Sequence, residues 1–279
     1  MRQGRSAFLT VWLAAGLVFL YGPILLMMFY SFNASRLATV WGGFSVRWYG
    51  ELLHNRLVID AALLSLEIAA VSATLATILG TMAGIALARF GRFRGRLLFS
   101  GMVTAPLVMP EVITGLSLLL LFVALEQATG WPPGRGMMTI TIAHVTFSMA
   151  YVAVVVQSRL ALIDESLEEA AMDLGSRPLR VLFDVTLPLL APAMVSGWLL
   201  AFTLSLDDLV IATFTSGPGA STLPMVIFSK VRLGLTPDIN ALATIIILVV
   251  SLIVVVGTLV MNRVQYRRLA ESQRAEAGR

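Results

Sequence analysis

Residues 166–188 read SLEEAAMDLGSRPLRVLFDVTLP, a charged and then apolar stretch that lies between two long apolar runs. From Leu160 to Leu174, apolar residues recur at the spacing of one helical face. Ser166 and Glu169 fit a capping box at the start of a helix, and Gly175 is placed to end that helix in a left-handed conformation. A second short helix would follow, and Leu187-Pro188 would turn the chain into the next apolar run. The stretch therefore predicts a helix–turn–helix.

The composition around this stretch is typical of a membrane protein. The chain has 279 residues, of which 58% are hydrophobic and 13% are charged, and its mean hydropathy is +0.87. A soluble domain carries about 25% charged residues, so this many apolar side chains need a solvent other than water. A membrane helix takes roughly 20 residues, and six apolar runs are long enough. They lie at 8–31, 61–88, 97–125, 137–157, 189–215 and 238–262.

The distribution of basic residues predicts the orientation of these six spans. With the N-terminus inside, 14 of the 20 Lys and Arg residues fall in the inside segments, the direction that the positive-inside rule requires. Both termini are then cytoplasmic, and residues 158–188 form the long cytoplasmic loop. The first apolar run is too long for a signal peptide, whose apolar core takes about 7–15 residues, and we interpret it as an uncleaved anchor.

Several classes of site are disfavoured by the sequence. The chain has no cysteine, which excludes disulfides and thiolate metal sites. His54 and His144 lie far apart and make a poor metal site. The arginines flank apolar runs, a pattern that favours membrane topology over nucleic-acid binding. The single lysine, Lys230, is not part of the Gly-Lys-Ser/Thr sequence of a phosphate-binding loop, so the energy for any transport must come from a partner or an ion gradient.

Four carboxylates fall inside the predicted spans, where ionisable side chains are costly and are candidates for function. They are Glu67, Glu111, Asp207 and Asp208. Pro106 and Pro110 should bend the third span just before Glu111 and free backbone carbonyls beside it. Bent helices with free carbonyls and carboxylates would suit the passage of an ammonium-bearing substrate.

Structural roles compete with this interpretation at each position. Glu67 lies near enough to the interface to form an ordinary structural hydrogen bond. Asp207 and Asp208 should point about 100° apart on a helix, so one could line a path while the other packs against a neighbour. Glu111 could satisfy backbone groups that the bend exposes.

The residues of the cytoplasmic loop resemble a known family. On periodicity alone, an ordinary pair of interfacial helices is favoured. However, Glu169-Ala170-Ala171, Gly175 and Leu187-Pro188 match the EAA loop of binding-protein-dependent ABC importer permeases, with Val185 where many members have isoleucine. Residues 204–211 (LSLDDLVI) resemble the putrescine and spermidine permeases of this family, closest to the putrescine subunit, and the similarity covers nearly the whole chain.

This resemblance implies a single permease domain, residues 1–279, with the type I ABC importer permease fold in a bacterial inner membrane. The chain would be a non-catalytic subunit without cofactor or metal. Its partners would be a second, different permease, two cytoplasmic ATPase subunits and a periplasmic binding protein, and it would import putrescine by alternating access. The residues that couple it to the ATPase would be Glu169, Ala170, Ala171, Asp173, Gly175, Leu187 and Pro188. The substrate path would take the four carboxylates together with Ser205.

Other functions stay open at this point. A secondary transporter or channel could use the same carboxylates as proton or cation sites, although a lone carrier has no use for a docking loop. A structural subunit of a larger membrane assembly is a further alternative. A membrane enzyme is the least favoured, because the sequence offers no arrangement of nucleophile and base.

Overall fold

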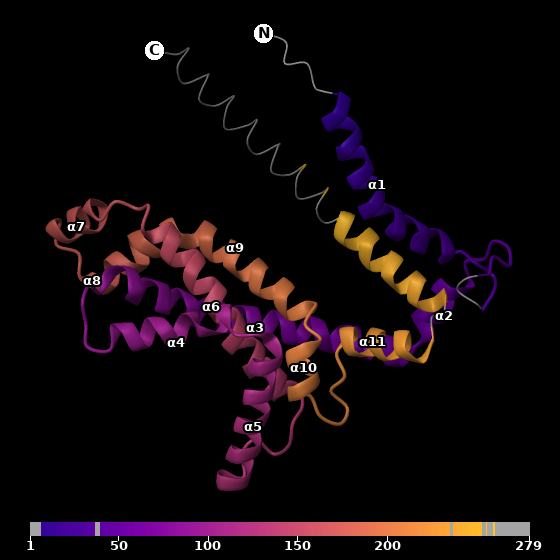
Figure 1. Cartoon of the computed structure of the whole chain (residues 1–279). Coiled ribbons are helices and arrows are strands. Elements are labelled where there is room, and N and C mark those ends of the chain that lie inside the picture. Colours follow the sequence, from indigo (N-terminus) through magenta and orange to yellow (C-terminus); the bar gives the residue numbers. More distant parts are fainter. Residues whose placement is uncertain (1–6, 37–39, 235–236, 253–254, 256–258, 260–279) are drawn as a thin grey trace. The chain divides into compact units, whose positions relative to one another are not determined.

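The computed structural model describes residues 7–36, 40–234, 237–252, 255 and 259. Regular secondary structure in these residues is helical throughout, with one isolated antiparallel bridge between Asn33 and Phe44 (Figure 1). The chain divides into two compact units, one of residues 1–56 with 229–279 and one of residues 57–228. The prediction of an all-helical membrane protein is confirmed, since five helices in the described residues are long and apolar enough to cross a membrane.

The helices divide between these units, except for those that cross the boundary. The first unit contains α1 (Ala7–Tyr30), α2 (Arg47–His54) and an apolar helix over Pro237–Leu252. The second contains nearly all of α3 (Arg56–Arg89) and the whole of the following elements: α4 (Arg96–Val108), α5 (Glu111–Thr129), α6 (Met137–Leu160), α7 (Ser166–Asp173), α8 (Pro178–Val181), the π-helix η1 (Leu182–Thr186), α9 (Leu187–Leu206) and α10 (Val210–Thr215). Helix α11 (Leu223–Leu233) crosses the boundary.

Three predicted spans correspond to single helices. The spans at 8–31, 61–88 and 137–157 match α1, α3 and α6, with ends that differ by a few residues. The sixth, at 238–262, begins as predicted, in the helix over Pro237–Leu252. Most of its remaining residues lie outside the described part of the chain.

The third predicted span, 97–125, is two helices rather than one bent helix. Helix α4 ends at Val108 and α5 begins at Glu111. Met109 between them is extended, with ψ 136°, because the ring of Pro110 disfavours helical backbone in the residue before it. Pro106, in contrast, is accommodated inside α4. The expected bend before Glu111 is therefore a complete break.

The fifth predicted span, 189–215, is also broken, and here neither proline nor glycine causes it. Helix α9 ends at Leu206 and α10 begins at Val210. The Asp208 carboxylate accepts hydrogen bonds from the backbone N–H groups of Ile211 and Ala212, at 3.2 and 2.7 Å, and so caps the new helix. The expectation that the two aspartates lie on one continuous helix is wrong, because both stand between two helices.

The core of the second unit is built around α6. A Cβ added at Gly80 of α3 would lie 2.7 Å from Val152 Cβ and 2.8 Å from the Met149 carbonyl oxygen, both on α6. One added at Gly84 would lie 2.9 Å from the Ala153 carbonyl oxygen. Small residues thus let the two backbones touch, as is common between membrane helices. This packing fixes the frame that carries the two broken helices.

Candidate functional site

The second halves of the two broken helices, α5 and α10, lie side by side in the second unit, and the first halves, α4 and α9, each pack against α6. Helix α10 packs along the first turns of α5 (Figure 1). The contact is close at Gly115, where an added Cβ would lie 3.3 Å from Ile211 Cα and 2.8 Å from the Phe214 ring. Glycine at this position therefore lets the two helices approach.

Both breaks lie near the contact between α5 and α10. The chain enters α4 and α9 from the same end, because Arg89, just before the loop that leads to α4, contacts Glu165 in the loop that leads to α9. The two broken helices therefore run in the same direction. Gly115 is four residues after Glu111, and its neighbour Ile211 is four residues after Asp207. At about 1.5 Å per residue, Glu111 lies roughly 6 Å before this contact, and Asp207 precedes it across the non-helical residues of the break.

Asp208 has a buried side chain that bonds to other groups of the protein. Its side chain is only 8% exposed, and in addition to capping α10 its Oδ2 lies 3.1 Å from Nε2 of His144 on α6. The other ring nitrogen, Nδ1, lies 2.6 Å from Ser205 Oγ on α9. Ser72 on α3 donates its hydroxyl to Ser205 Oγ at 3.0 Å. The buried chain Ser72–Ser205–His144–Asp208 thus joins three helices at the break.

One assignment of protons satisfies every group in this chain. Ser72 donates to Ser205, Ser205 donates to Nδ1 of His144, and Nε2–H donates to Asp208. Serine, histidine and aspartate are also the residue types of a hydrolase triad. Here, however, the Ser205 side chain is buried and its hydroxyl is used within the chain. The arrangement ties helices together and presents no nucleophile. The sequence disfavours His144 as a metal ligand but does not indicate this role, since its partners lie about 60 residues away in the chain.

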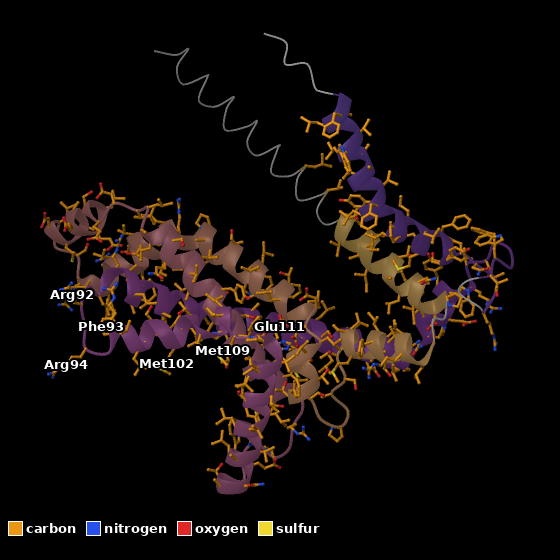
Figure 2. All side chains as sticks on the ribbon, in the orientation of Figure 1. Arg92, Phe93, Arg94, Met102, Met109 and Glu111 are labelled. Atoms are coloured by element: carbon orange, nitrogen blue, oxygen red, sulfur yellow. The ribbon has the colours of Figure 1, made fainter. Side chains whose placement is uncertain are left out.

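The other candidate carboxylates have exposed side chains. Glu111 is the first residue of α5, directly after the break (Figure 2). Asp207 directly follows the last residue of α9. Glu67 lies on the exposed side of α3, a continuous helix, and not at a break. The structure thus brings Glu111 and Asp207 to neighbouring breaks.

The backbone at the breaks also favours a cation. The C-terminal ends of α4 and α9 carry partial negative charge from their last carbonyl groups. Pro110 has no N–H with which to bond back into α4. Broken membrane helices with such carbonyl ends are used by transporters to hold cations. The N-termini of α5 and α10 at the same breaks carry the opposite partial charge, which Glu111 and the capping Asp208 offset. The carboxylates and the two helix C-termini together make an environment for positive charge.

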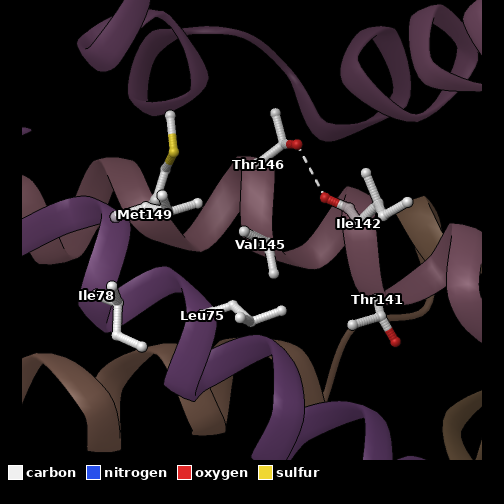
Figure 3. A pocket seen from close by; sticks show the side chains of 8 residues that line it. Leu75, Ile78, Thr141, Ile142, Val145, Thr146 and Met149 are labelled. Atoms are coloured by element: carbon white, nitrogen blue, oxygen red, sulfur yellow. Dashed lines mark hydrogen bonds between the residues drawn. The ribbon is translucent and has the colours of Figure 1, made fainter.

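An apolar groove lies between α3 and α6, away from these carboxylates (Figure 3). Its volume is about 380 Å³, and its lining includes Leu75, Ile78, Val145 and Met149. The Thr146 hydroxyl in its wall donates to the Ile142 carbonyl oxygen at 2.8 Å. A groove of this character offers nothing to an ammonium group, so we do not place the substrate there.

The cytoplasmic loop has the predicted helix–turn–helix form. Gly175 has φ +90°, its N–H donates to the Met172 carbonyl, and the next N–H, of Ser176, donates to the Ala171 carbonyl. These are the bonds of a helix ended by a left-handed glycine. The prediction that Gly175 ends the helix is confirmed.

Two local details of the loop differ from prediction. Ser166 does not cap α7; its backbone N–H donates instead to Asp164 Oδ1 at 3.0 Å. This bond holds the pKa of the Asp164 carboxyl below its usual range. Leu187-Pro188 does not turn the chain, because α8, η1 and α9 form one continuous helical segment. The π-helix adapts to the proline: the Leu187 N–H reaches back five residues to the Leu182 carbonyl.

The surface of this loop is open to a partner. Helix α7 has no buried residue, and Glu169, Ala170 and Asp173 are exposed, as is Pro188 further on. Large apolar side chains around them are exposed, which is unusual for a solvated loop and typical of a contact surface. They are Leu162, Leu167, Met172, Leu174, Leu179 and Phe183.

Comparison with known proteins gives consistent results. The family model for binding-protein-dependent transport system inner membrane components matches residues 76–269. The chain is 60% identical to the putrescine transport system permease protein PotI of Escherichia coli, over 98% of both chains. It is 40% identical to the spermidine/putrescine transport system permease protein PotC of the same species, over 93% of this chain and 94% of that one.

Solved structures share the fold at low sequence identity. A bacterial ABC transporter involved in the import of alginate matches with a TM-score of 0.70 at 18% identity, covering 93% of this chain and 97% of that one. The MetNI methionine ABC transporter in an inward-facing conformation matches with a TM-score of 0.58 at 18% identity, over 72% of this chain and 93% of that one. These likenesses show the ABC importer permease fold.

Proposed function

Because the chain belongs to the family of binding-protein-dependent transport system inner membrane components, we propose that it is the permease subunit of an ATP-driven putrescine importer. The assignment of putrescine as the substrate rests on the 60% identity to a putrescine permease over 98% of both chains. The two exposed carboxylates, Glu111 and Asp207, support it, because putrescine has a positive charge at each end.

Family membership implies two kinds of partner, an ATPase and a substrate-binding protein. We further propose two ATPase subunits and a second, different permease chain that resembles this one. The second permease is needed because the exposed carboxylates at the breaks lie on an open surface of a single chain. A second chain facing that surface would close the path.

Transport would proceed by alternating access. Closure of the ATPases on ATP would bring the two coupling loops together and open the spans outward. The contact with the ATPase would be made by the loop within residues 158–188, through Glu169, Ala170, Ala171, Asp173 and Gly175. Leu187 and Pro188 would pass the movement into α9, since they begin that helix.

Within the path, we assign different roles to the predicted residues. Glu111 and Asp207 would meet the ammonium groups, and Glu67 would lie nearer the outer end. Ser205 and Asp208 would lie behind them and hold the break through His144. This division follows from burial: Ser205 and Asp208 are enclosed by protein, whereas the other three side chains are exposed.

The partners can be tested by isolating the tagged chain from its native membrane in a gentle detergent and identifying the copurifying proteins by mass spectrometry. The account expects an ATPase with a phosphate-binding loop and a second permease. Replacing Glu169 by Lys should remove the ATPase and leave the second permease. A folded chain recovered alone would contradict the proposal and favour a self-sufficient cation carrier.

A further inference from the structure

The last residue of α3, Arg89, is held by the coupling loop. Its side chain is 14% exposed, and its Nη1 lies 2.7 Å from Glu165 Oε1. Its Nε lies 3.2 Å from Glu168 Oε2, and its Nη2 donates to the Ile163 carbonyl oxygen at 3.2 Å. Nη1 and Nη2 thus hydrogen-bond to groups before the start of α7, while Nε faces Glu168 as an ion pair without an aligned hydrogen bond. The planar fork that presents three nitrogens to separate groups distinguishes arginine from lysine.

Glu168 extends this contact to the helix that follows. Its side chain is 17% exposed, and its second oxygen, Oε1, accepts a hydrogen bond from Thr186 Oγ1 at 3.0 Å. Thr186 is buried and is the last residue of η1, directly before α9. Glu168 therefore stands between the end of α3 and the start of α9.

Comparison with the neighbouring arginines indicates that Arg89 does more than set the orientation of the spans. Arg92 and Arg94 are exposed in the loop between α3 and α4 (Figure 2). Arg96 bonds to the Gly91 and Leu87 carbonyl oxygens, at 2.5 and 2.8 Å, and so stays with its own hairpin. Arg89 is the arginine of this segment that pairs with carboxylates of the coupling loop, and a positive-inside charge needs no such partners.

These contacts matter because the other main contacts of α7 in the described residues are with α8 and η1, and not with α3. None of its residues is buried, so it lacks the apolar contacts that would fix it firmly to the spans. A partly buried ion pair whose members also hydrogen-bond to the protein keeps its geometry better than an exposed pair. Movement of α7 would therefore reach α3 through Arg89 and reach α9 through Glu168 and Thr186.

We infer that Arg89 and Glu168 form a clasp that couples movement of the ATPase-docking helix α7 to the transmembrane helices α3 and α9. The inference rests on the proposed function, since it assumes that an ATPase moves α7. Arg89 is a positioning residue: it touches neither nucleotide nor substrate. If the clasp exists, a substitution in this permease chain should reduce transport while ATP hydrolysis continues.

The test uses the whole transporter in proteoliposomes, with ATP hydrolysis and labelled putrescine uptake measured on the same preparation. Arg89→Glu should keep the ATPase bound and hydrolysing, while putrescine taken up per ATP falls roughly tenfold, within the range of ordinary coupling energies. The double variant Arg89→Glu with Glu168→Arg should recover part of that loss, because it restores the ion pair with position 168 but leaves a carboxylate facing Glu165 and the Ile163 carbonyl. Arg92→Glu, an equal charge change in the same loop, should transport like the natural chain.

The outcomes separate this inference from the proposed function. Uptake per ATP that is unchanged in Arg89→Glu, or a double variant no better than the single one, overturns the clasp. If Arg89→Glu does not assemble, Arg89→Lys decides: one ammonium cannot hold all three groups, so uptake per ATP should fall several-fold, and an unchanged value overturns the clasp. Failure of the natural transporter to take up putrescine would instead contradict the proposed function.

Discussion

His144 on α6 and Asp208 in the break between α9 and α10 form a buried contact, with Nε2 3.1 Å from Oδ2. The same carboxylate caps α10 through two backbone N–H groups. The adjacent Asp207 is exposed. Two neighbouring aspartates of the same chemistry are thereby given different environments, one inside the protein and one at the end of a broken helix.

The first prediction compares these two aspartates. Asp208→Ala removes a helix cap and the partner of a buried histidine, losses of about 1 kcal/mol and 1–3 kcal/mol respectively. It should lower the melting temperature of the purified transporter in detergent. Asp207→Asn should leave that temperature unchanged and reduce putrescine uptake. A melting temperature that falls equally in both variants would contradict this division of roles.

A second prediction concerns the contact between α3 and α6. Gly80→Ala places a Cβ 2.7 Å from Val152 Cβ and 2.8 Å from the Met149 carbonyl oxygen. The helices must then separate, at a cost of roughly 1–3 kcal/mol. Gly101→Ala in α4 is the matched control, because no atom lies within 4 Å of its added Cβ. Thermal melting should show Gly80→Ala destabilised and Gly101→Ala equal to or above the natural chain, and the reverse order would refute the packing described.

Gly175 gives a third prediction, on the coupling loop. A Cβ there meets no atom within 4 Å, but φ is +90°, a conformation that costs most residues about 1–2 kcal/mol and asparagine less. The amount of ATPase that copurifies with the tagged permease should therefore be highest for the natural chain. It should be lower for Gly175→Asn and lowest for Gly175→Ala. If the side chain itself blocks docking, asparagine, the larger residue, would be the worse of the two. That order would show that backbone conformation is not the reason for glycine here.

The fourth prediction tests the orientation of the spans. The chain has no cysteine, so single cysteines can be introduced without background. In right-side-out spheroplasts, a membrane-impermeant maleimide should label Arg135→Cys in an outer loop and leave Arg92→Cys unlabelled. Both should react once the membrane is permeabilised. Labelling of Arg92→Cys in intact spheroplasts would place the loop between α3 and α4 outside, and the termini with it.

Much of the architecture was predictable because it depends on local patterns. Long apolar runs identified the spans, and the left-handed glycine at Gly175 ended its helix as expected. The break before Glu111 had a local cause in Pro110, so its place was predicted, although its extent was underestimated.

The break at Asp207–Asp208 was not predictable in this way. It contains neither proline nor glycine, and the residue that holds Asp208 there, His144, is distant in the chain. The role of Arg89 is likewise not predictable from the sequence, since its carboxylate partners lie 76 and 79 residues away. Tertiary partners of this kind leave no spacing signal in a single sequence.

We propose that this chain moves putrescine only as part of an ATP-driven assembly. This proposal is tested most directly by reconstituting the chain with its copurifying partners in proteoliposomes and measuring accumulation of labelled putrescine, with and without ATP. We expect accumulation that requires ATP and the binding protein and stops when the lysine of the ATPase's phosphate-binding loop is replaced. Accumulation driven by an ion gradient in vesicles that contain this chain alone would contradict it.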